Sequence, residues 1–312
     1  MRSGWEAADP PQRPVLFVNP KSGGRKVERA GLTERARERG IEVIVMQPDQ
    51  TLAKMADEAV ARGADALGVA GGDGSLAVVA ATALAHGLPF VCVPAGTRNH
   101  FALDLGVDRR DLLGSLDAFT DGVERRIDAA EVNGRVFLNN ASLGIYGDAV
   151  RQPTYRDAKA RTLLETAAEV LGPSTAAVDL QLVDDRGRAH RNPAVVLVSN
   201  NPYSLDPARA TGTRPTLDSG ELGIVVLDTP RAGQGPGRTW TATRLEVSAP
   251  APVHTGIDGE AVELAPPFEF VIRPRTLRVR IARGHSGLSP SGRLASRAGP
   301  NKAGTRRSAG SG

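Results

Sequence analysis

Short apolar runs alternate with helical segments between residues 15 and 119, and this alternation constrains the fold more than any other feature of the sequence. The apolar runs are typical of buried strands and cover residues 15–18, 41–46, 66–70 and 90–93. The pattern predicts helices at residues 25–39, 51–62, 75–86 and 112–119. Strands that alternate with helices form a parallel sheet covered on both faces, so we expect an N-terminal α/β domain.

The pattern changes after residue 127. Residues 130–132 and 136–138 flank Asn133-Gly134, which is a strong signal for a β-hairpin. One predicted helix, at residues 156–171, is followed mainly by predicted strands, at residues 178–183, 194–199, 222–227, 239–247, 268–272 and 277–281. We therefore expect an α/β domain over residues 13–127 and a mainly antiparallel β domain over residues 128–283.

The last segment, residues 284–312, has a composition of its own. It is rich in Gly and Ser, contains no acidic residue, and carries the basic residues Arg293, Arg297, Lys302, Arg306 and Arg307. This composition predicts a disordered basic tail. Such a tail adds weak attraction to an anionic membrane surface or to nucleic acid, although a solvated tail without a role is the favoured alternative.

Cysteine content and hydropathy indicate the compartment. The single cysteine, Cys92, cannot form an internal disulfide, which favours a reducing compartment. No N-terminal segment has the pattern of a signal peptide. The most apolar region, residues 66–93, is interrupted by glycines and Pro89, as in buried strands around a helix and unlike a membrane span. We therefore expect a cytoplasmic protein.

The first of three glycine-rich turns follows the first predicted strand and contains Asn19, Pro20, Lys21, Ser22 and Gly23. Ligands of open α/β sheets bind beyond the carboxyl ends of the strands. Backbone N–H groups and the start of the next helix attract anions there, and Lys21 adds a positive charge. The spacing of a P-loop is absent. Taken alone, this segment is therefore better interpreted as an ordinary strand-to-helix turn.

The second turn contains Gly71, Gly72, Asp73, Gly74 and Ser75, between the third predicted strand and a helix. Its glycines let a ligand approach the backbone, and the helix start favours phosphate oxygens. Asp73 would repel bare phosphate. A bound Mg²⁺ resolves this conflict, because a carboxylate can hold the metal that bridges the phosphates. The alternative is a tight turn in which Asp73 caps a helix.

The third turn lies in residues 94–102, where Thr97 and Asn99 can each cap a helix or bond a phosphate. The three turns lie at one edge of one predicted sheet, and their convergence is the argument for a nucleotide site. Asp258 and Glu260, separated by one glycine, are candidates for the carboxylate that accepts the hydroxyl proton in phosphoryl transfer. By spacing alone, a surface turn is the favoured interpretation of that pair.

Together these segments resemble the diacylglycerol kinase catalytic-domain family, which includes bacterial soluble lipid kinases and the sphingosine and ceramide kinases. The matching segments follow the family's order and cover most of residues 13–282: they are residues 19–23, 71–76, 94–106, 137–144, 217–225 and 258–260. The pairing of Gly-Gly-Asp-Gly with Pro-x-Gly-Thr-x-Asn-x-Phe-Ala is specific. Gly-Gly-Asp-Gly alone also suits the related NAD kinases and phosphofructokinases.

The resemblance implies an NAD kinase/diacylglycerol kinase-like fold with the active site in a cleft between the domains. It implies ATP and Mg²⁺, and a lipid substrate such as diacylglycerol reached by transient, peripheral association with a membrane. Carried over by position, the first and second turns surround the ATP phosphates, Thr97 contacts the nucleotide, and Asp258 or Glu260 is the general base. No specific nucleic-acid partner is implied, and the oligomeric state, including a homodimer, stays open.

The resemblance also implies a structural Mg²⁺ near residues 217–222. Asp218 is present there, but Ser219 stands where many members have a second Asp.

Other positions depart from the family pattern. Ser75 replaces a Thr and keeps the hydroxyl, while Ala77 and Val78 stand where bacterial members often have Asn-Glu. Arg98 and His100 stand where many members have Gly and Asp. The loss of that carboxylate means that Mg²⁺ is held differently, that the acceptor differs, or that catalysis is weak. Two alternatives to a lipid kinase therefore stay open: an NAD kinase-like enzyme with a soluble acceptor, and a relative that binds nucleotide or lipid without catalysis.

Overall fold

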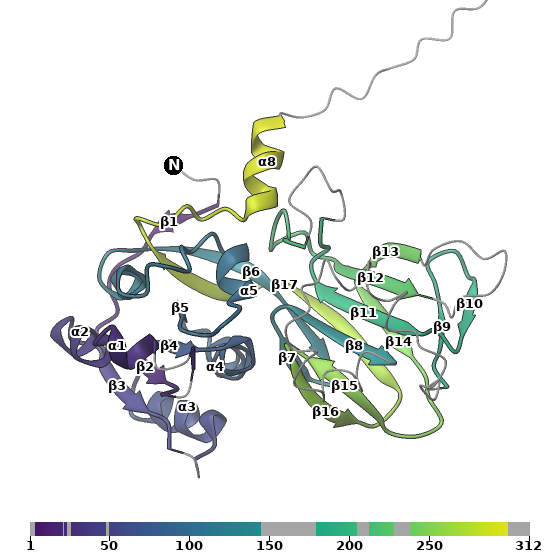
Figure 1. Ribbon diagram of the computed structural model, residues 1–312, viewed down its shortest axis with the longest axis horizontal. Helices are drawn as coiled ribbons and strands as arrows, with labels where there is room; N and C mark the ends of the chain where they lie inside the picture. Colours follow the sequence, from purple (N-terminus) through teal and green to yellow (C-terminus); the bar gives the residue numbers. More distant parts are fainter. Residues whose placement is uncertain are drawn as a thin grey trace, which may run out of the picture.

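The computed structural model describes residues 4–20, 22–23, 26–47, 50–144, 179–204, 212–227 and 238–298. These residues form an α/β lobe and a β lobe that lie side by side (Figure 1). Two long strands, β6 (Gly122–Val132) and β17 (Phe268–Ala282), run through both lobes. The predicted fold class is confirmed.

The α/β lobe is built on one sheet with the strand order β1-β6-β17-β5-β4-β2-β3. Its shorter strands are β1 (Glu6–Ala7), β2 (Pro14–Val18), β3 (Glu42–Val45), β4 (Ala66–Gly71) and β5 (Phe90–Pro94). Strands β3, β2, β4 and β5 are parallel to one another, and the C-terminal part of β17 continues the parallel set beside β5. The carboxyl ends of β2, β4 and β5 therefore share one edge.

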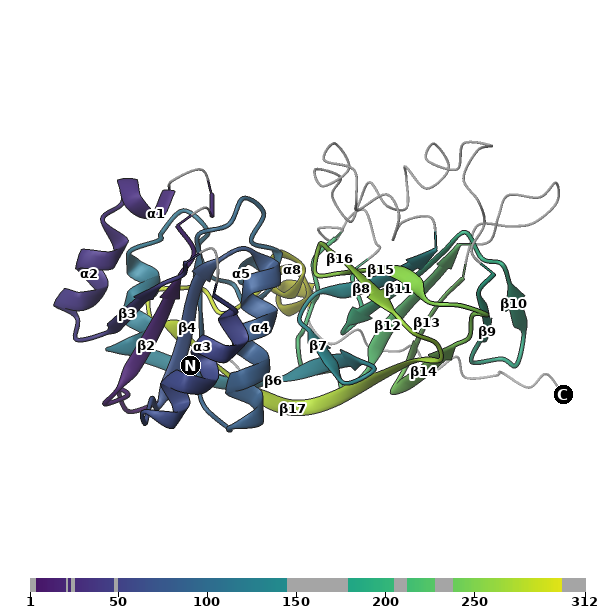
Figure 2. The same ribbon diagram turned by 90° about the horizontal axis from the view of Figure 1, so that it is seen from below.

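Helices cover both faces of this sheet (Figure 2). One face carries α3 (Leu52–Ala61), α4 (Asp73–Ala85) and α5 (His100–Asp104), and the other carries α1 (Lys26–Arg29), α2 (Leu32–Glu38) and the 3₁₀ helix η1 (Gly114–Phe119). Side chains alternate along β2: Val15 and Phe17 join the core beneath α3 and α4, whereas Leu16 and Val18 join the core beneath α1 and α2. A strand buried on both faces has a continuous run of apolar residues, and residues 15–18 form such a run in the sequence.

The single helix predicted at residues 25–39 is wrong, because the chain forms two helices there. Gly31 lies between α1 and α2 with φ of 59°, in the left-handed region that a continuous helix does not visit. Because this segment is mostly polar, its apolar residues give no periodic pattern that marks where one helix ends and the next begins.

The β lobe contains a six-stranded antiparallel sheet with the order β13-β12-β11-β8-β15-β16. Its strands are β8 (Asn140–Gly144), β11 (Val195–Asn200), β12 (Leu222–Leu227), β13 (Arg238–Ala242), β15 (Val253–Ile257) and β16 (Glu260–Leu264). The other strands are β7 (Arg135–Phe137), which pairs with β6, β14 (Arg244–Val247), which pairs with β17, and the hairpin of β9 (Gln181–Val183) and β10 (Ala189–Arg191). Apolar residues of this sheet pack against β7, β14 and the adjoining parts of β6 and β17.

The hairpin predicted at Asn133-Gly134 is confirmed. These two residues join β6 to β7 with φ values of 48° and 77°. Both values are positive, as a two-residue turn with the twist of a hairpin requires.

The two strands predicted at residues 268–272 and 277–281 are one strand, β17. Its register against β6 shifts between Arg273 and Leu277, and Arg275 adopts φ of 52°. This irregularity interrupts the side-chain alternation, which is why the sequence pattern divided the strand. The expected domain boundary at residues 127 and 128 falls inside β6. The helix predicted at residues 156–171 lies outside the described residues.

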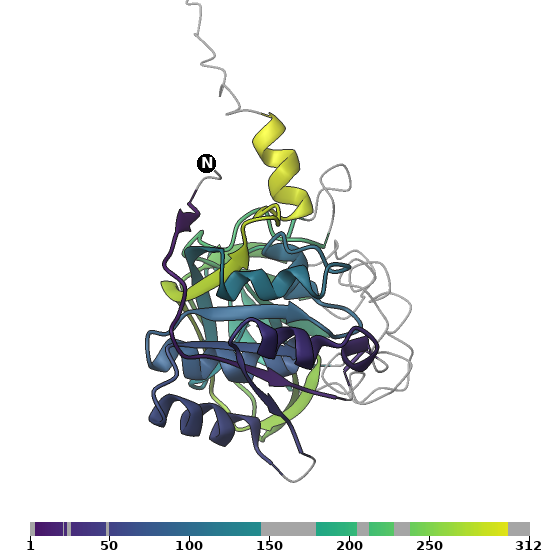
Figure 3. The same cartoon turned by 90° about the vertical axis from the view of Figure 1, so that its left-hand side faces the viewer.

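The prediction of a disordered tail is wrong for residues 284–298. The Trp5 indole N–H donates to the carbonyl of Gly287 at 2.9 Å, and the Ser289 hydroxyl donates to the carbonyl of Arg214 at 2.5 Å. Helix α8 (Pro290–Ala298) follows and projects from the body (Figure 3). These hydrogen bonds order a segment that has little apolar surface, so composition alone does not reveal them. Within the described residues, none of the helices combines the length and apolar character needed to cross a membrane.

The β lobe depends on apolar packing between β17 and its neighbours. Phe270 is fully buried, and its ring meets that of Phe137 edge to face at 6.4 Å between centroids. We expect Phe270→Ala to lower the free energy of unfolding by about 3–5 kcal/mol, because it removes a large side chain from a closed core. Chemical denaturation measures the change. Leu294→Ala, on the exposed face of α8, is the control and should change it by less than about 0.5 kcal/mol.

Candidate active site

The three glycine-rich turns meet at the carboxyl edge of the parallel sheet. The Gly96 N–H donates to the carbonyl of Gly71 at 3.0 Å, and the Asn19 N–H donates to the carbonyl of Ala70 at 3.0 Å. A Cβ on Gly23 would lie 2.1 Å from the carbonyl oxygen of Ala95. Glycine is therefore needed where these turns touch. The predicted convergence of the turns is confirmed, while Lys21 lies outside the described residues.

Open space lies beside the second turn. A Cβ added to Gly72 would meet no atom within 4 Å, whereas one added to Gly96 would lie 2.7 Å from the Cα of Gly72. Gly96 is thus required by the protein's own packing, and Gly72 is not. A glycine with free space beside it leaves room for a ligand to approach the backbone, as the phosphates of a nucleotide would do.

Asp73 links the second turn to the third. It begins α4, and its two carboxylate oxygens accept hydrogen bonds from the backbone N–H groups of His100 and Phe101, both at 3.3 Å. The expected alternative, a helix cap, therefore exists, but Asp73 caps α5 and not its own helix. A carboxylate has about four acceptor positions, so these two bonds leave Asp73 able to ligate a metal. The residues present fit a Mg²⁺ that arrives with a nucleotide.

His100 occupies the first position of α5, close to Asp73. Burial lowers the pKa of His100, and the negative charges of Asp73 and Asp104 act in the opposite direction. The imidazole is therefore largely neutral at pH 7. It does not replace the carboxylate that the family resemblance implies at this position.

Asn99 and Thr97 differ in their surroundings. Asn99 is buried with φ of 52°, and its side-chain amide donates to the carbonyls of Pro94 at 3.2 Å and Gly96 at 2.8 Å. This amide closes the third turn, so the structure gives Asn99 a structural role. Thr97 is exposed at the tip of the same turn, where a ligand can reach it.

Asp258 lies across the cleft in the turn between β15 and β16. Its carboxylate accepts backbone hydrogen bonds from Leu138 and Asn139, both at 2.8 Å, and from Asn140 at 3.2 Å. Burial, together with the smaller effect of the negative charge of Asp73, raises the pKa of Asp258 to about 7, against the effect of these donors. Asp258 is therefore expected to titrate near neutral pH. Three N–H donors leave one acceptor position for a substrate proton.

The turn at Asp258 is a two-residue hairpin turn and not an ordinary surface turn. Asp258 and Gly259 have φ values of 48° and 86°, and they join β15 to β16. Asp-Gly between two strands is a recognised hairpin signal. Asp258-Gly259 therefore carries a local hairpin signal for β15 and β16 as well as a candidate acid.

Glu260 lies against the second glycine-rich turn. A Cβ on Gly74 would lie 2.1 Å from a Glu260 carboxylate oxygen, so the two lobes touch here. The Glu260 side chain is 55% exposed and lies 3.9 Å from the Arg135 guanidinium. Because Glu260 is exposed while Asp258 is buried and fixed by three donors, the geometry favours Asp258 as the base.

A cavity of about 270 Å³ separates α4 from the hairpins of the β lobe and is bordered by Asp258 and Glu260. Most of its other walls are apolar: they are formed by Ala53, Ala77, Val78, Ala81, Val136 and Ile257. Ala77 and Val78 are the residues that stand where related bacterial kinases often have Asn-Glu. This cavity suits a hydroxyl group carried on a hydrocarbon body.

A larger cavity of about 850 Å³ opens on the other side of the third turn, next to Gly23, Gly96 and Thr97. Its polar walls include a group of basic side chains, Lys26, Arg98, Arg109, Arg110 and Arg293. Asp108 and Asp111 also border it, so the charge of the wall is positive in sum. Such a cavity favours an anionic ligand.

Asp218 does not fit the predicted structural metal site. Its carboxylate accepts hydrogen bonds from Arg125 at 2.7 Å, from Arg275 at 3.5 Å and from the Thr216 hydroxyl. Burial acts to raise its pKa, but the bonds from Arg125 and Thr216 hold the pKa of Asp218 below its usual value. No group of three or more metal-ligating side chains occurs among the described residues. Guanidinium groups occupy the position that the resemblance gives to a cation.

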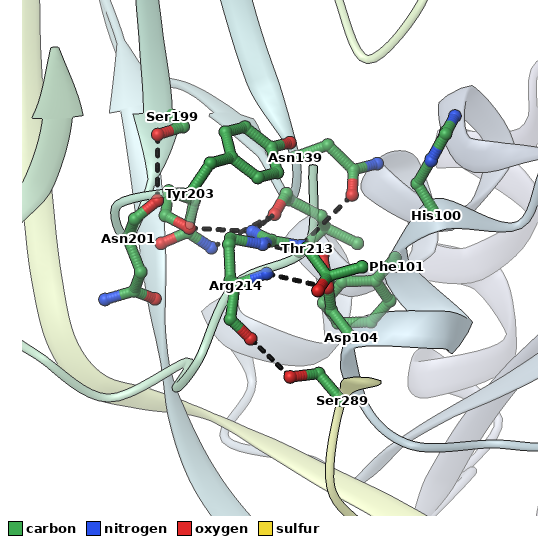
Figure 4. Close-up of polar contacts among 12 residues, drawn as sticks. His100, Phe101, Asp104, Asn139, Ser199, Asn201, Tyr203, Thr213, Arg214 and Ser289 are labelled. Atoms are coloured by element: carbon green, nitrogen blue, oxygen red, sulfur yellow. Dashed lines mark hydrogen bonds and ion pairs between the residues drawn. The ribbon is translucent and has the colours of Figure 1, made fainter. Parts of the chain in front are cut away.

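Sequence reasoning missed the buried polar residues that hold the cleft together. Asp104, Tyr203 and Arg214 form a cluster at the junction of the two lobes (Figure 4). Asp104 and Arg214 are 110 positions apart in the chain, so no local sequence pattern pairs them. A charged residue in an otherwise uncharged stretch was the one available signal.

Comparison with known proteins agrees with this arrangement. Residues 13–132 match the family described as the diacylglycerol kinase catalytic domain. The chain is 29% identical over 292 residues to a Pseudomonas aeruginosa protein named "Probable lipid kinase YegS-like", covering 86% of this chain and 94% of that protein. It is 36% identical over 141 residues to the diacylglycerol kinase of Bacillus subtilis, covering 43% of this chain and 46% of that enzyme.

A solved structure has the same fold. The crystal structure of a diacylglycerol kinase from Bacillus anthracis superposes with a TM-score of 0.62 at 16% identity, covering 88% of this chain and 98% of that one. The solved structure therefore shares both the α/β lobe and the β lobe with this chain. Residues 13–132 match the diacylglycerol kinase catalytic-domain family, and over most of its length the chain is similar to a protein named as a probable lipid kinase.

Proposed function

We propose that this protein transfers the γ-phosphoryl group of ATP to the hydroxyl of diacylglycerol or a related lipid. The observation that carries the proposal is the position of Asp258. This carboxylate is buried, fixed by three backbone donors and poised near pH 7, and it borders an apolar cavity that touches the second glycine-rich turn.

In the proposed reaction, the turns at residues 19–23 and 71–75 hold the triphosphate on the α/β lobe. Asp73 holds the Mg²⁺, which neutralises charge on the phosphates when bound. The lipid hydroxyl enters the cavity beside Asp258 and gives its proton to that carboxylate. The hydroxyl oxygen then forms a bond to the γ-phosphorus as the bond to the departing ADP breaks.

Most of the rate enhancement in this scheme comes from positioning. The two lobes hold the phosphate and the hydroxyl together, and the base removes a proton whose loss the reaction requires. The apolar wall formed by Ala77 and Val78 favours a lipid over a sugar or a dinucleotide. This wall is the reason for preferring a lipid acceptor to the soluble acceptor of an NAD kinase-like enzyme.

Replacement of the base tests the mechanism. We expect Asp258→Asn to lower kcat by about 10²–10⁴-fold in transfer of labelled phosphate from ATP to dispersed diacylglycerol, because it removes the proton acceptor. In the unchanged protein, kcat/KM should rise with pH and level off above about pH 7, since Asp258 must be ionised to accept the proton. The variant should lack this rise.

Glu260→Gln is the matched control for the base. It also removes a carboxylate from the cavity, but Glu260 is exposed, so its kcat should stay within about tenfold of the unchanged protein. A larger loss in Glu260→Gln than in Asp258→Asn would assign the base to Glu260 instead.

The role of the second turn can be tested sterically. Gly72 has open space beside it and φ of −86°, so Gly72→Val should fold normally. We expect its side chain to fill the space assigned to the phosphates and to weaken ATP binding at least about tenfold, or about 1.4 kcal/mol. Isothermal titration calorimetry measures binding, and the melting temperature checks folding. Unchanged affinity in a folded variant would place the phosphates elsewhere.

We also propose that the protein works in the cytoplasm and binds the membrane surface transiently. Its basic cavity and the basic residues near the C-terminus support this proposal. Removing residues 299–312 takes away Lys302, Arg306 and Arg307, each worth about 1 kcal/mol near an anionic surface. We expect at least about tenfold weaker partitioning onto phosphatidylserine vesicles at low salt. Equal binding by the truncated and complete chains would exclude a role for this segment.

A further inference from the structure

Arg214 is a fully buried charged residue at the junction of the two lobes. Its guanidinium has no exposed surface and bonds to both lobes at once (Figure 4). A buried ion pair is often no more stabilising than apolar residues of the same volume. Stability alone therefore does not explain why a buried arginine lies between the lobes, and its hydrogen-bond geometry has to be considered.

On one side, Arg214 binds the α/β lobe through Asp104. Its Nε donates to one carboxylate oxygen of Asp104 at 2.8 Å, and its backbone N–H donates to the other at 3.0 Å. Asp104 is the last residue of the short helix α5. The first N–H groups of this helix are those that donate to Asp73. Helix α5 thus joins Arg214 to the acid of the second glycine-rich turn.

On the other side, Arg214 binds the segment that holds Asp258. Its Nη1 donates to the carbonyl of Leu138 at 2.5 Å, and its Nη2 donates to the side-chain oxygen of Asn139 at 3.1 Å. The backbone N–H groups of the same two residues donate to the two oxygens of Asp258. The position of Asp258 therefore depends on residues that Arg214 fixes.

Tyr203 completes the support. Its ring lies 5.6 Å from the Arg214 guanidinium, and its hydroxyl accepts a hydrogen bond from the side chain of Asn140 at 3.2 Å. Asn140 is the third backbone donor to Asp258. Arg214 and Tyr203 together thus hold each of the three residues whose N–H groups bind the candidate base.

We propose that Arg214 is a positioning residue that sets the location of Asp258 relative to Asp73, acting through Leu138 and Asn139 on one side and Asp104 on the other. This inference rests on the proposed function for its catalytic consequence. A planar guanidinium is suited to this task because it directs donors to several acceptors in a fixed geometry. A lysine at this position offers one point charge and cannot reproduce the arrangement.

The test uses a double variant, Asp104→Asn with Arg214→Met. Removing Arg214 alone would leave Asp104 buried without its partner and could prevent folding, whereas the double variant removes one charge of each sign. We expect it to fold, to keep the KM for ATP within about threefold, and to lose about 100-fold in kcat, because a small displacement of a catalytic group is costly. The single variant Arg214→Lys, with Asp104 unchanged, should have a kcat between those of the double variant and the unchanged protein.

The pH profile separates positioning from simple stabilisation. If residues 138–139 loosen, the hydrogen bonds that favour the ionised form of Asp258 weaken, so the pKa of Asp258 should rise. The rise of kcat/KM with pH should then move to higher pH by about one unit or more. A residue that acts only on stability would reduce the folded fraction and leave this profile unchanged. Unchanged kcat and profile in the folded double variant would overturn the proposal.

A second readout does not depend on lipid phosphorylation. The carboxyl carbons of ¹³C-labelled aspartate report the titration of Asp258 directly, with Asp258→Asn identifying the signal. The Asp258 signal should titrate near pH 7 in the unchanged protein and at higher pH in the double variant. If the unchanged protein phosphorylates no lipid, the proposed function fails, yet this titration still decides whether Arg214 positions Asp258.

A matched control lies in the same lobe. Asp184 and Arg238 form another ion pair with a buried carboxylate, at the far side of the β lobe where β9 and β13 lie (Figure 1). The variant Asp184→Asn with Arg238→Met should leave kcat and the titration of Asp258 unchanged per folded molecule. An equal change in this control would show that any lost ion pair in the lobe has the same effect, and would remove the specific role of Arg214.

Discussion

The antiparallel pairing of β6 with β17 is the interaction on which the rest of the molecule depends. One part of this pair, from Leu277 to Ala282 on β17, completes the sheet of the α/β lobe beside β5. The other part, from Phe270 to Arg273, forms the floor of the β lobe. Because one hydrogen-bonded ladder serves both lobes, their separation is fixed by strand geometry and not by a flexible linker.

Within the cleft, buried charges have a cost that the fold offsets by hydrogen bonding. Asp258 is removed from water and keeps only part of its tendency to ionise, while three backbone donors limit the penalty. Arg214 and Asp104 neutralise each other a short distance away. Residues 138 and 139 bond to both Arg214 and Asp258, so a change at Arg214 alters the hydrogen bonds that Asp258 receives. Such an arrangement favours a single geometry for the Asp258 carboxylate.

Near residue 218, positively charged side chains of the protein balance the charge of a carboxylate. Asp218 is paired with Arg125 and Arg275, at the position where the family resemblance implies a metal ion. Nearby, Asp128 is fully buried and accepts hydrogen bonds from Asn201 at 2.7 Å and from the backbone N–H of Gly220 at 2.7 Å. Side-chain cations and backbone donors thus organise this loop.

The sequence by itself determined the lobe architecture and the meeting of the three turns. Both follow from local rules: apolar runs between helical segments form a parallel sheet, and the carboxyl ends of such strands share an edge. The Asn133-Gly134 hairpin was equally local. The family motifs added Asp258 and Glu260 as a pair of candidates without choosing between them.

Only the tertiary structure decided which acid is buried, what holds it and which side chains pair with Asp218. Asp258 receives its donors from residues 118 to 120 positions away in the chain, and Arg214 binds Asp104 from 110 positions away. The continuity of β17 and the order of residues 284–298 likewise depend on partners remote in sequence. Burial, and with it the pKa of a carboxyl group, is set by what packs around the group in space. A linear pattern records the residue but not its surroundings, so these features belong to the folded molecule alone.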